Sequence, residues 1–254
     1  GIGPEVFIKS LSDPAVYKNL SSFVVVASQM VLQDTIKNLD KSYKINLISD
    51  QFDLASDSIN LLHVDGCLKY GLGSPKKENA EYVLKCLSSA SDLANEYQSC
   101  LVTGPINKKI LSFAQKNFSG HTEFLQNRFK ADEVLMYMSN GLLHLGIITT
   151  HIPLADVPKS ISKQLIIQKF RLLNDGLASI FNISRPKIAV LGLNPHAGES
   201  GQIGKEEEII ITPAINELKD LGYDAIGPIS ADTAFSTGDY NAVLSMYHDQ
   251  ALPV

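Results

Sequence analysis

Three histidines share one sequence setting, in which an apolar run gives way to polar or Gly- and Pro-containing sequence: His151, His196 and His248. In open α/β sheets, ligands bind just outside the carboxyl ends of the strands. Imidazoles placed there can converge although about fifty positions separate them along the chain. Neutral imidazole suits zinc and other first-row divalent ions, and three protein ligands leave one coordination position open. The pattern indicates a catalytic metal site; ordinary hydrogen-bonded loop histidines are the alternative.

The other histidines fall into two groups. His63 and His144 lie inside strand-like runs, which favours structural roles for both. His121 follows a glycine and is followed by Thr122 and Glu123. A loop-to-helix turn of this kind can hold an anion on its backbone N–H groups. The alternative is a plain helix cap with Thr122 near the N-cap position.

Two carboxylates accompany the histidines. Asp232 is either a carboxylate near the metal or the side chain of an Asx turn. Asp249 directly follows His248 and either orients that imidazole as an acceptor or is simply solvated. The segment Asn194–Glu199 is too polar and too rich in turn-forming residues for a plain connector.

Several familiar motifs are missing from the sequence. No GxGxxG follows a strand-like run, and there is neither a P-loop nor a GxSxG elbow. The three cysteines form no CxxC pair, which suits a reducing compartment and excludes a cysteine-based zinc site. Each is predicted to be a small apolar filler: Cys67, Cys86 and Cys100.

Composition narrows the class of protein. A chain of 254 residues with 44% hydrophobic residues can bury a substantial core. A net charge of -5 and the lack of any basic run argue against nucleic-acid and acidic-lipid partners. No apolar stretch is long enough to cross a bilayer and no signal peptide is visible, so we expect a cytoplasmic protein. The chain starts at Gly1 and stops inside an apolar segment, so we also expect it to be incomplete at both ends.

Strand-like runs alternate with helical periods over most of the chain. Strands are predicted at 22–27, 45–48, 59–64, 100–103, 187–193 and 242–246, and helices at 29–38, 75–97, 161–180 and 205–221. This alternation is typical of an α/β architecture with a largely parallel sheet. No repeat or low-complexity linker appears, so two subdomains would have to be interwoven.

One segment breaks the alternation. Residues 134–139 and 142–149 flank Asn140 and Gly141, the strongest short hairpin signal in a sequence. An antiparallel hairpin within an α/β chain indicates a sheet edge, a crossing between subdomains or a dimer arm.

Seven short stretches, taken together, resemble the 4-hydroxythreonine-4-phosphate dehydrogenase family of pyridoxal phosphate biosynthesis. They are GIGPE from Gly1, VTGPINK from Val102, SGHTEF from Ser119, TTHIPL from Thr149, LNPHAGE from Leu193, ADTAF from Ala231 and MYHDQALPV from Met246. They follow the family's order from the first residue to the last, so the resemblance covers the whole chain. The combination is highly specific, although each stretch alone is weak.

The resemblance implies a fold and an assembly. The fold would be α/β, with two interwoven α/β/α subdomains and a cleft between them, and a subdomain boundary near 120–150. It would be similar to isocitrate and isopropylmalate dehydrogenases, which bind NAD(P) without a Rossmann fingerprint. The assembly would be a homodimer with active sites at the subunit interface, so the three histidines need not converge within one chain.

The resemblance also implies site residues. The family's metal-binding histidines fall on His151, His196 and His248, its substrate-binding His-Thr pair on His121 and Thr122, and the carboxylate of its Ala-Asp-Thr motif on Asp232. The family pattern continues beyond both ends of this chain. In particular, a Lys, an Asn and an Arg that bind substrate would lie past the last residue.

The implied reaction is a metal-dependent, NAD(P)-linked oxidation in vitamin B6 biosynthesis. It converts 4-phosphooxy-L-threonine into a 3-oxo acid that decarboxylates to 3-amino-2-oxopropyl phosphate. Its cofactors would be NAD or NADP and one divalent ion, zinc, magnesium or cobalt. Related dehydrogenases of threonate or erythronate 4-phosphate should share the histidines, so the substrate stays open. Two competing hypotheses are a metal-dependent phosphohydrolase and a non-catalytic metal-binding protein.

Overall fold

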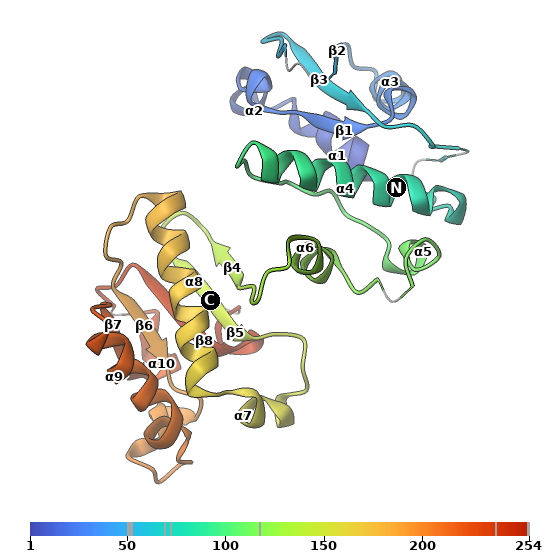
Figure 1. Ribbon diagram of the computed structural model, residues 1–254. Coiled ribbons are helices and arrows are strands. Elements are labelled where there is room, and N and C mark those ends of the chain that lie inside the picture. The colour runs from blue at the N-terminus through green and yellow to red at the C-terminus, as the bar shows by residue number, and fades with distance from the viewer. Residues whose placement is uncertain (50–52, 69, 72, 117, 237, 253–254) are drawn as a thin grey trace. The chain divides into compact units, whose positions relative to one another are not determined.

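The computed structural model describes residues 1–49, 53–68, 70–71, 73–116, 118–236 and 238–252. The chain divides into two compact units, Gly1–Asn127 and Arg128–Val254. Each unit carries its own β-sheet and its own buried apolar core (Figure 1).

The first unit is built on a parallel three-stranded sheet. The strand order is β1 (Val25–Ala27), β3 (Ser58–His63) and β2 (Lys44–Ile48). Its helices are α1 (Gly3–Ser10), α2 (Pro14–Lys18), α3 (Gln29–Asn38), α4 (Ala80–Glu96), α5 (Lys108–Leu111) and α6 (His121–Phe129), with 3-10 turns η1 (Leu20–Ser22) and η2 (Lys77–Asn79). Apolar side chains of α1, α3 and β3 pack into one core, including Ile8, Leu32, Ile36, Ile59 and Leu61.

The second unit is built on a mixed five-stranded sheet. Its strand order is β4 (Met136–Ser139), β5 (His144–Thr149), β8 (Ala242–Tyr247), β6 (Ile188–Leu191) and β7 (Ala225–Ile229). The last four are parallel to one another, and only β4 is antiparallel to its neighbour. Its helices are α7 (Val157–Ser160), α8 (Lys163–Phe181), α9 (Thr212–Asp220), α10 (Ala231–Ala234) and α11 (His248–Ala251). Shorter turns are η3 (Leu154–Asp156), η4 (Pro195–Glu199) and the π-helical η5 (Glu207–Ile211).

Helices cover both faces of this second sheet. Side chains alternate along a strand, so Leu244 and Met246 of β8 join the core that includes α8 and α9, while Val243 joins the core that includes α10 and α11. In Figure 1, α8 crosses in front of β5 and β8. Because both faces are buried, the central strands read as unbroken apolar runs in the sequence.

Most of the predicted elements are confirmed, beginning with the α/β architecture. Helix α3 has the predicted bounds, and the predicted hairpin is formed by β4 and β5. Its loop spans residues 140–143, where the Asn140 carboxamide oxygen accepts the N–H groups of Leu142 and Leu143 at 3.0 and 2.8 Å. Strand β4 is at the end of the sheet, so the hairpin forms a sheet edge.

The strand predicted at 100–103 is wrong. In the described part of the chain this run pairs with neither sheet, Val102 is 89% exposed, and Cys100 is exposed instead of filling a core. A short apolar run has no periodicity that identifies a strand, and only a hydrogen-bonded neighbour decides its conformation.

Two features of the second unit were not predicted. Strand β7 contains Gly227 and Pro228, residues that disfavour a strand interior. It lies at the sheet edge, where the N–H missing from proline is tolerated. The helix predicted at 205–221 is divided, because the π-helical turn η5 precedes α9.

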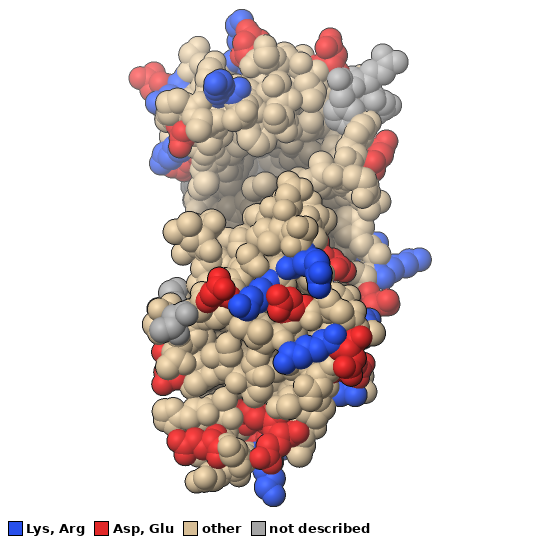
Figure 2. Space-filling view, turned by 90° about the vertical axis from the view of Figure 1, so that its left-hand side faces the viewer, with Lys and Arg blue, Asp and Glu red and all other residues tan. Residues whose placement is uncertain are grey.

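Figure 2 shows one face of the molecule, on which Lys and Arg side chains lie among Asp and Glu side chains. Mixed charge of this kind avoids an extended field of one sign. Within the described ranges, no helix combines the length and apolarity required to cross a membrane.

Candidate active site at the carboxyl ends of β5, β8 and β6

The carboxyl ends of three adjacent parallel strands deliver the three histidines. His151 follows β5 by two residues, His248 directly follows β8 as the first residue of α11, and His196 lies in η4 after β6. Strand β8 is hydrogen-bonded to β5 on one side and to β6 on the other, and Thr149 is in register with Tyr247. The sheet order therefore explains how histidines so distant in sequence reach one edge.

His151 and His248 are neighbours at this edge. Their ring centroids are 5.9 Å apart, with an interplanar angle of 43°. The Nδ1 atom of His248 is 2.6 Å from Oδ1 of Asp249. An ionised carboxylate can only accept, so in the neutral imidazole Nδ1 carries the proton and Nε2 keeps its lone pair, the form that binds a metal.

His196 faces a carboxylate. Its Nδ1 is 3.9 Å from Oδ2 of Asp232, and both side chains are 60% exposed. The Ser230 hydroxyl donates a 2.5 Å hydrogen bond to Asp232. This hydrogen bond, assisted by the charge of His196, lowers the pKa of Asp232 from its ordinary value. Asp232 is therefore ionised at neutral pH and is a weak proton acceptor.

Two of the three histidines have unusual backbone conformations. His151 has φ +54°, and His196 has φ +53°, followed by Ala197 at +51°. Non-glycine residues rarely adopt this left-handed region, and such residues cluster at functional sites. The turn-rich segment around His196 is thus a tight, left-handed turn and not a plain connector.

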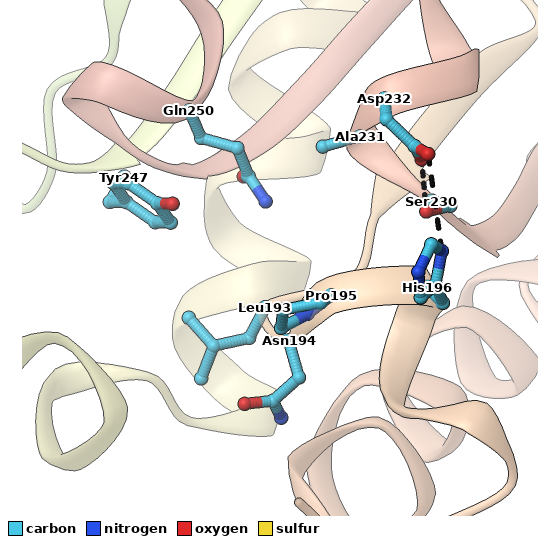
Figure 3. A pocket seen from close by; sticks show the side chains of 9 residues that line it. All are labelled: Leu193, Asn194, Pro195, His196, Ser230, Ala231, Asp232, Tyr247 and Gln250. Carbon is cyan, nitrogen blue, oxygen red and sulfur yellow. Dashed lines mark hydrogen bonds and ion pairs between the residues drawn. The ribbon is translucent and has the colours of Figure 1, made fainter. Parts of the chain in front are cut away.

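A pocket opens beside His196 (Figure 3). Nine residues line it: Leu193, Asn194, Pro195, His196, Ser230, Ala231, Asp232, Tyr247 and Gln250. Gln250 was not predicted. Its Oε1 accepts the N–H of Met246 at 2.7 Å and its Nε2 donates to the Gly192 carbonyl at 2.6 Å, so it ties the end of β8 to the end of β6.

The nitrogen and oxygen atoms of these side chains suit a divalent metal, but they do not converge on a single point. Among the described residues, no three His, Cys, Asp or Glu side chains are grouped closely enough to hold an ion. The site instead contains two pairs, His151 with His248 and His196 with Asp232. The imidazole that Asp249 orients is the strongest sign of a ligand position, because its free nitrogen is the one a metal requires.

His121 and Thr122 belong to the first unit, where they begin α6. Nε2 of His121 is buried and has no hydrogen-bond partner within the part of the chain that the structure describes. Burial, and then the charge of Lys108, lower the pKa of His121. Helix α6 starts at His121, so Thr122 is its second residue and lies near the N-cap position. An unpaired imidazole nitrogen near a lysine is suited to an anionic or hydroxylated ligand.

His63 and His144 make contacts inside their own units. Nδ1 of His63 accepts the N–H of Gln29, the first residue of α3, at 3.0 Å. His144 is buried and hydrogen-bonded to the Tyr137 hydroxyl. Both contacts agree with the structural roles that their positions in strands favour.

Comparison with known proteins decides the family. The profile of the pyridoxal phosphate biosynthetic protein PdxA matches residues 19–254. The chain belongs to the PdxA family. The family predicted from the seven ordered stretches is therefore confirmed, and with it a dehydrogenase class of enzyme.

Relatives of the PdxA family cover nearly all of this chain. It is 37% identical to the 4-hydroxythreonine-4-phosphate dehydrogenase of Marinobacter nauticus, over 100% of this chain and 76% of that protein. It is also 37% identical to the enzyme of the same name from a Sulfurihydrogenibium species, over 99% of this chain and 78% of the relative.

A solved PdxA-family structure shows the same fold. The crystal structure of a 4-hydroxythreonine-4-phosphate dehydrogenase from Burkholderia phymatum matches with a TM-score of 0.89 at 31% identity, over 98% of this chain and 78% of that chain. The α/β fold, with its parallel three-stranded sheet and its mixed five-stranded sheet, is therefore that of the family.

Proposed function

We propose that this chain oxidises 4-phosphooxy-L-threonine with NAD or NADP. The product is a 3-oxo acid, which loses carbon dioxide to give 3-amino-2-oxopropyl phosphate in vitamin B6 biosynthesis. The observation that carries the proposal is the sheet edge at which His151, His196 and His248 follow three adjacent strands. The activity named for the curated relatives supports the choice of substrate.

His151, His196 and His248 would hold one divalent ion, zinc, magnesium or cobalt. The ion would polarise the substrate hydroxyl and stabilise the negative charge that develops on its oxygen. The contact between Asp249 and His248 supports this assignment, because it leaves Nε2 available.

Asp232 would act as a fixed negative charge in the site. Its lowered pKa keeps it ionised, and its Oδ2 lies 3.9 Å from Nδ1 of His196. A carboxylate of this kind positions cationic and hydrogen-bond-donating groups better than it accepts a proton.

His121 and Thr122 would bind the substrate. The lowered pKa keeps His121 neutral at pH 7, and its buried Nε2 needs a partner. The neighbouring Lys108 supplies a positive charge for a phosphate or carboxylate group. Such contacts fix the reacting carbon next to the nicotinamide.

The nicotinamide cofactor would bind without a Rossmann fingerprint, since no GxGxxG is present. We also propose the remaining family features: interwoven subdomains similar to isocitrate dehydrogenase, and a homodimer with its active sites at the subunit interface. These features rest on family membership.

The first test is His196→Ala in the complete protein. Turnover of 4-phosphooxy-L-threonine, followed as NADH or NADPH formation, should fall at least about a hundredfold, because a ligand of the polarising ion is lost. The melting temperature should change little, since His196 is 60% exposed. His63→Ala, which alters a histidine of the other unit, is the control and should retain turnover.

Unchanged turnover and metal content in His196→Ala would refute the metal assignment. Faster oxidation of threonate or erythronate 4-phosphate than of 4-phosphooxy-L-threonine would reassign the substrate. Release of phosphate without NAD or NADP would indicate a phosphohydrolase instead.

A further inference from the structure

Glu207, the first residue of η5, is a buried carboxylate behind the loop that carries His196. It is only 3% exposed. Its Oε1 accepts the backbone N–H groups of Leu193 and Asn194, both at 2.7 Å. Its Oε2 accepts the side-chain amide of Asn194 at 2.9 Å. All three hydrogen bonds end on the two residues that lead from β6 into η4.

Glycines let the loop close around this carboxylate. A Cβ atom at Gly198 would lie 2.6 Å from Oε2 of Glu207. One at Gly192 would lie 2.8 Å from Cα of Ala197 and 3.2 Å from Oε1 of Glu207. Gly198 also has φ +80°. A larger residue at Gly198 would collide with the carboxylate and strain the turn, so glycine is required there for two independent reasons.

His196 lies between the two points of contact. Asn194 precedes it and is held by both oxygens of Glu207, and Gly198 follows it against the same carboxylate. Left-handed backbone at His196 and Ala197 persists only when the surroundings determine it. Hydrogen bonds to a buried carboxylate are strong enough to supply that constraint. Glu207 begins a π-helical turn. Such turns are rare in proteins overall, and those that occur are often found at functional sites.

We propose that Glu207 is a positioning residue: its carboxylate fixes the loop of residues 193–198 in the conformation that presents His196 to the site. The inference rests on the proposed function for the role of His196 as a metal ligand, but the loop conformation itself does not. Glu207 contacts no reacting atom and acts through the loop.

The test compares Glu207→Gln with Glu208→Gln in the complete protein. Glutamine keeps the size of the side chain but replaces one acceptor oxygen with an NH₂ group. This donor would face the N–H groups of Asn194, which are donors as well. Glu208 is the matched control, since it is the next residue of the same turn and is exposed. Three quantities are measured: amide hydrogen exchange of residues 193–199 without metal, Co²⁺ affinity by calorimetry, and kcat and KM.

Glu207→Gln should speed exchange in the loop and lower Co²⁺ affinity about tenfold, the usual effect of losing a partner that orients a ligand. The kcat should fall more than KM rises. Glu208→Gln should leave all three quantities within about twofold of the parent. Glu207→Ala, which loses all three hydrogen bonds, should show larger changes; if it does not fold, Glu207→Gln carries the test alone.

Parental exchange in Glu207→Gln would overturn the inference. Faster exchange with parental Co²⁺ affinity and kcat would overturn it as well, because the loop would then be fixed for stability alone. Failure of the proposed function would be recognised separately, because His196→Ala would then keep the Co²⁺ affinity and the turnover of the parent protein. In that case the exchange measurement still decides whether Glu207 fixes the loop.

Discussion

At the scale of single residues, the chemistry of each histidine depends on which of its nitrogens is already engaged. Nδ1 of His248 contacts the carboxylate of Asp249, which leaves Nε2 for a ligand. Nδ1 of His144 is hydrogen-bonded to the Tyr137 hydroxyl, and His144 is buried as the first residue of β5. His121 keeps a buried Nε2 without a partner among the described residues, a state that costs about 1–3 kcal/mol unless a ligand relieves it.

The lowered pKa of His121 is a testable residue-scale property. Burial is its larger cause and the charge of Lys108 the smaller one. Lys108→Met should therefore raise the pKa of His121 without restoring the ordinary value, as measured by NMR titration of its ring protons. Lys109→Met is the control, because Lys109 is also exposed but has no such effect on His121.

The sign of the pH effect follows from the direction of this shift. The folded state favours the neutral form of a histidine whose pKa is lowered. The contribution of His121 to the free energy of unfolding is therefore complete above pH 6.5 and is lost as the pH falls through its pKa in the folded protein. Lys108→Met should reduce this acid sensitivity. A His121 titration that does not move in Lys108→Met, or moves equally in Lys109→Met, would contradict the assignment.

At the scale of elements, the order of strands places the site and a few buried polar contacts hold the strands. Lys169 of α8 is one such contact, with a side chain only 9% exposed. Its Nζ donates to Glu133 at 2.8 Å and to the Val134 carbonyl, just before β4. This contact attaches the edge hairpin to the helix that covers the sheet.

Lys169→Met should destabilise the protein by about 1–3 kcal/mol at pH 7, because it removes the partner of a partly buried carboxylate. Urea unfolding measures this difference. Lys163→Met on the same helix is the matched control: Lys163 pairs with Glu217 at the surface, so its loss should cost at most about 1 kcal/mol.

The cost of Lys169→Met should depend on pH. Burial raises the pKa of Glu133, but the hydrogen bond and charge of Lys169 and the N–H of Val134 lower it further, so the net pKa is below 4.5. The stabilisation is therefore complete above about pH 4.5 and disappears as the pH falls through the folded-state pKa. If Lys169→Met lowered the free energy of unfolding equally at pH 7 and at pH 3, the Lys169–Glu133 pair would not be the source of the lost stability.

At the scale of the whole molecule, the candidate metal site is built outside the cores. Each unit has its own apolar cluster, and the three histidines lie beyond the strand ends. We therefore expect the fold of each unit to depend on apolar burial and not on an ion.

Chelation of the proposed metal ion should therefore abolish turnover but leave the fold intact. Binding stabilises a folded protein only by mass action, about 2.7 kcal/mol at a hundredfold excess over Kd. We expect EDTA to lower the melting temperature by a few degrees without changing the far-UV circular dichroism, and added Co²⁺ or Zn²⁺ to restore both melting temperature and turnover. Unfolding upon chelation would show instead that the ion is structural.

The sequence by itself determined what depends on local pattern. The period of the apolar residues was enough to predict helices α3 and α8. Asn140 and Gly141, which favour a tight hairpin loop, were enough to predict the β4–β5 hairpin. Short ordered stretches were enough to predict the family, and strand ends marked the three histidines.

Only the tertiary structure decided what depends on pairing between distant segments. The strand predicted at residues 100–103 was wrong and strand β7 was not predicted, because hydrogen-bonded neighbours decide whether a short run becomes a strand. Glu207 and Gln250 were missed for the same reason: their partners are backbone groups at the end of β6, and nothing in their own sequence announces those contacts. Asp249 could be predicted as the partner of His248 because it is the next residue, whereas only the packing of distant segments brings Glu207 against the loop of His196.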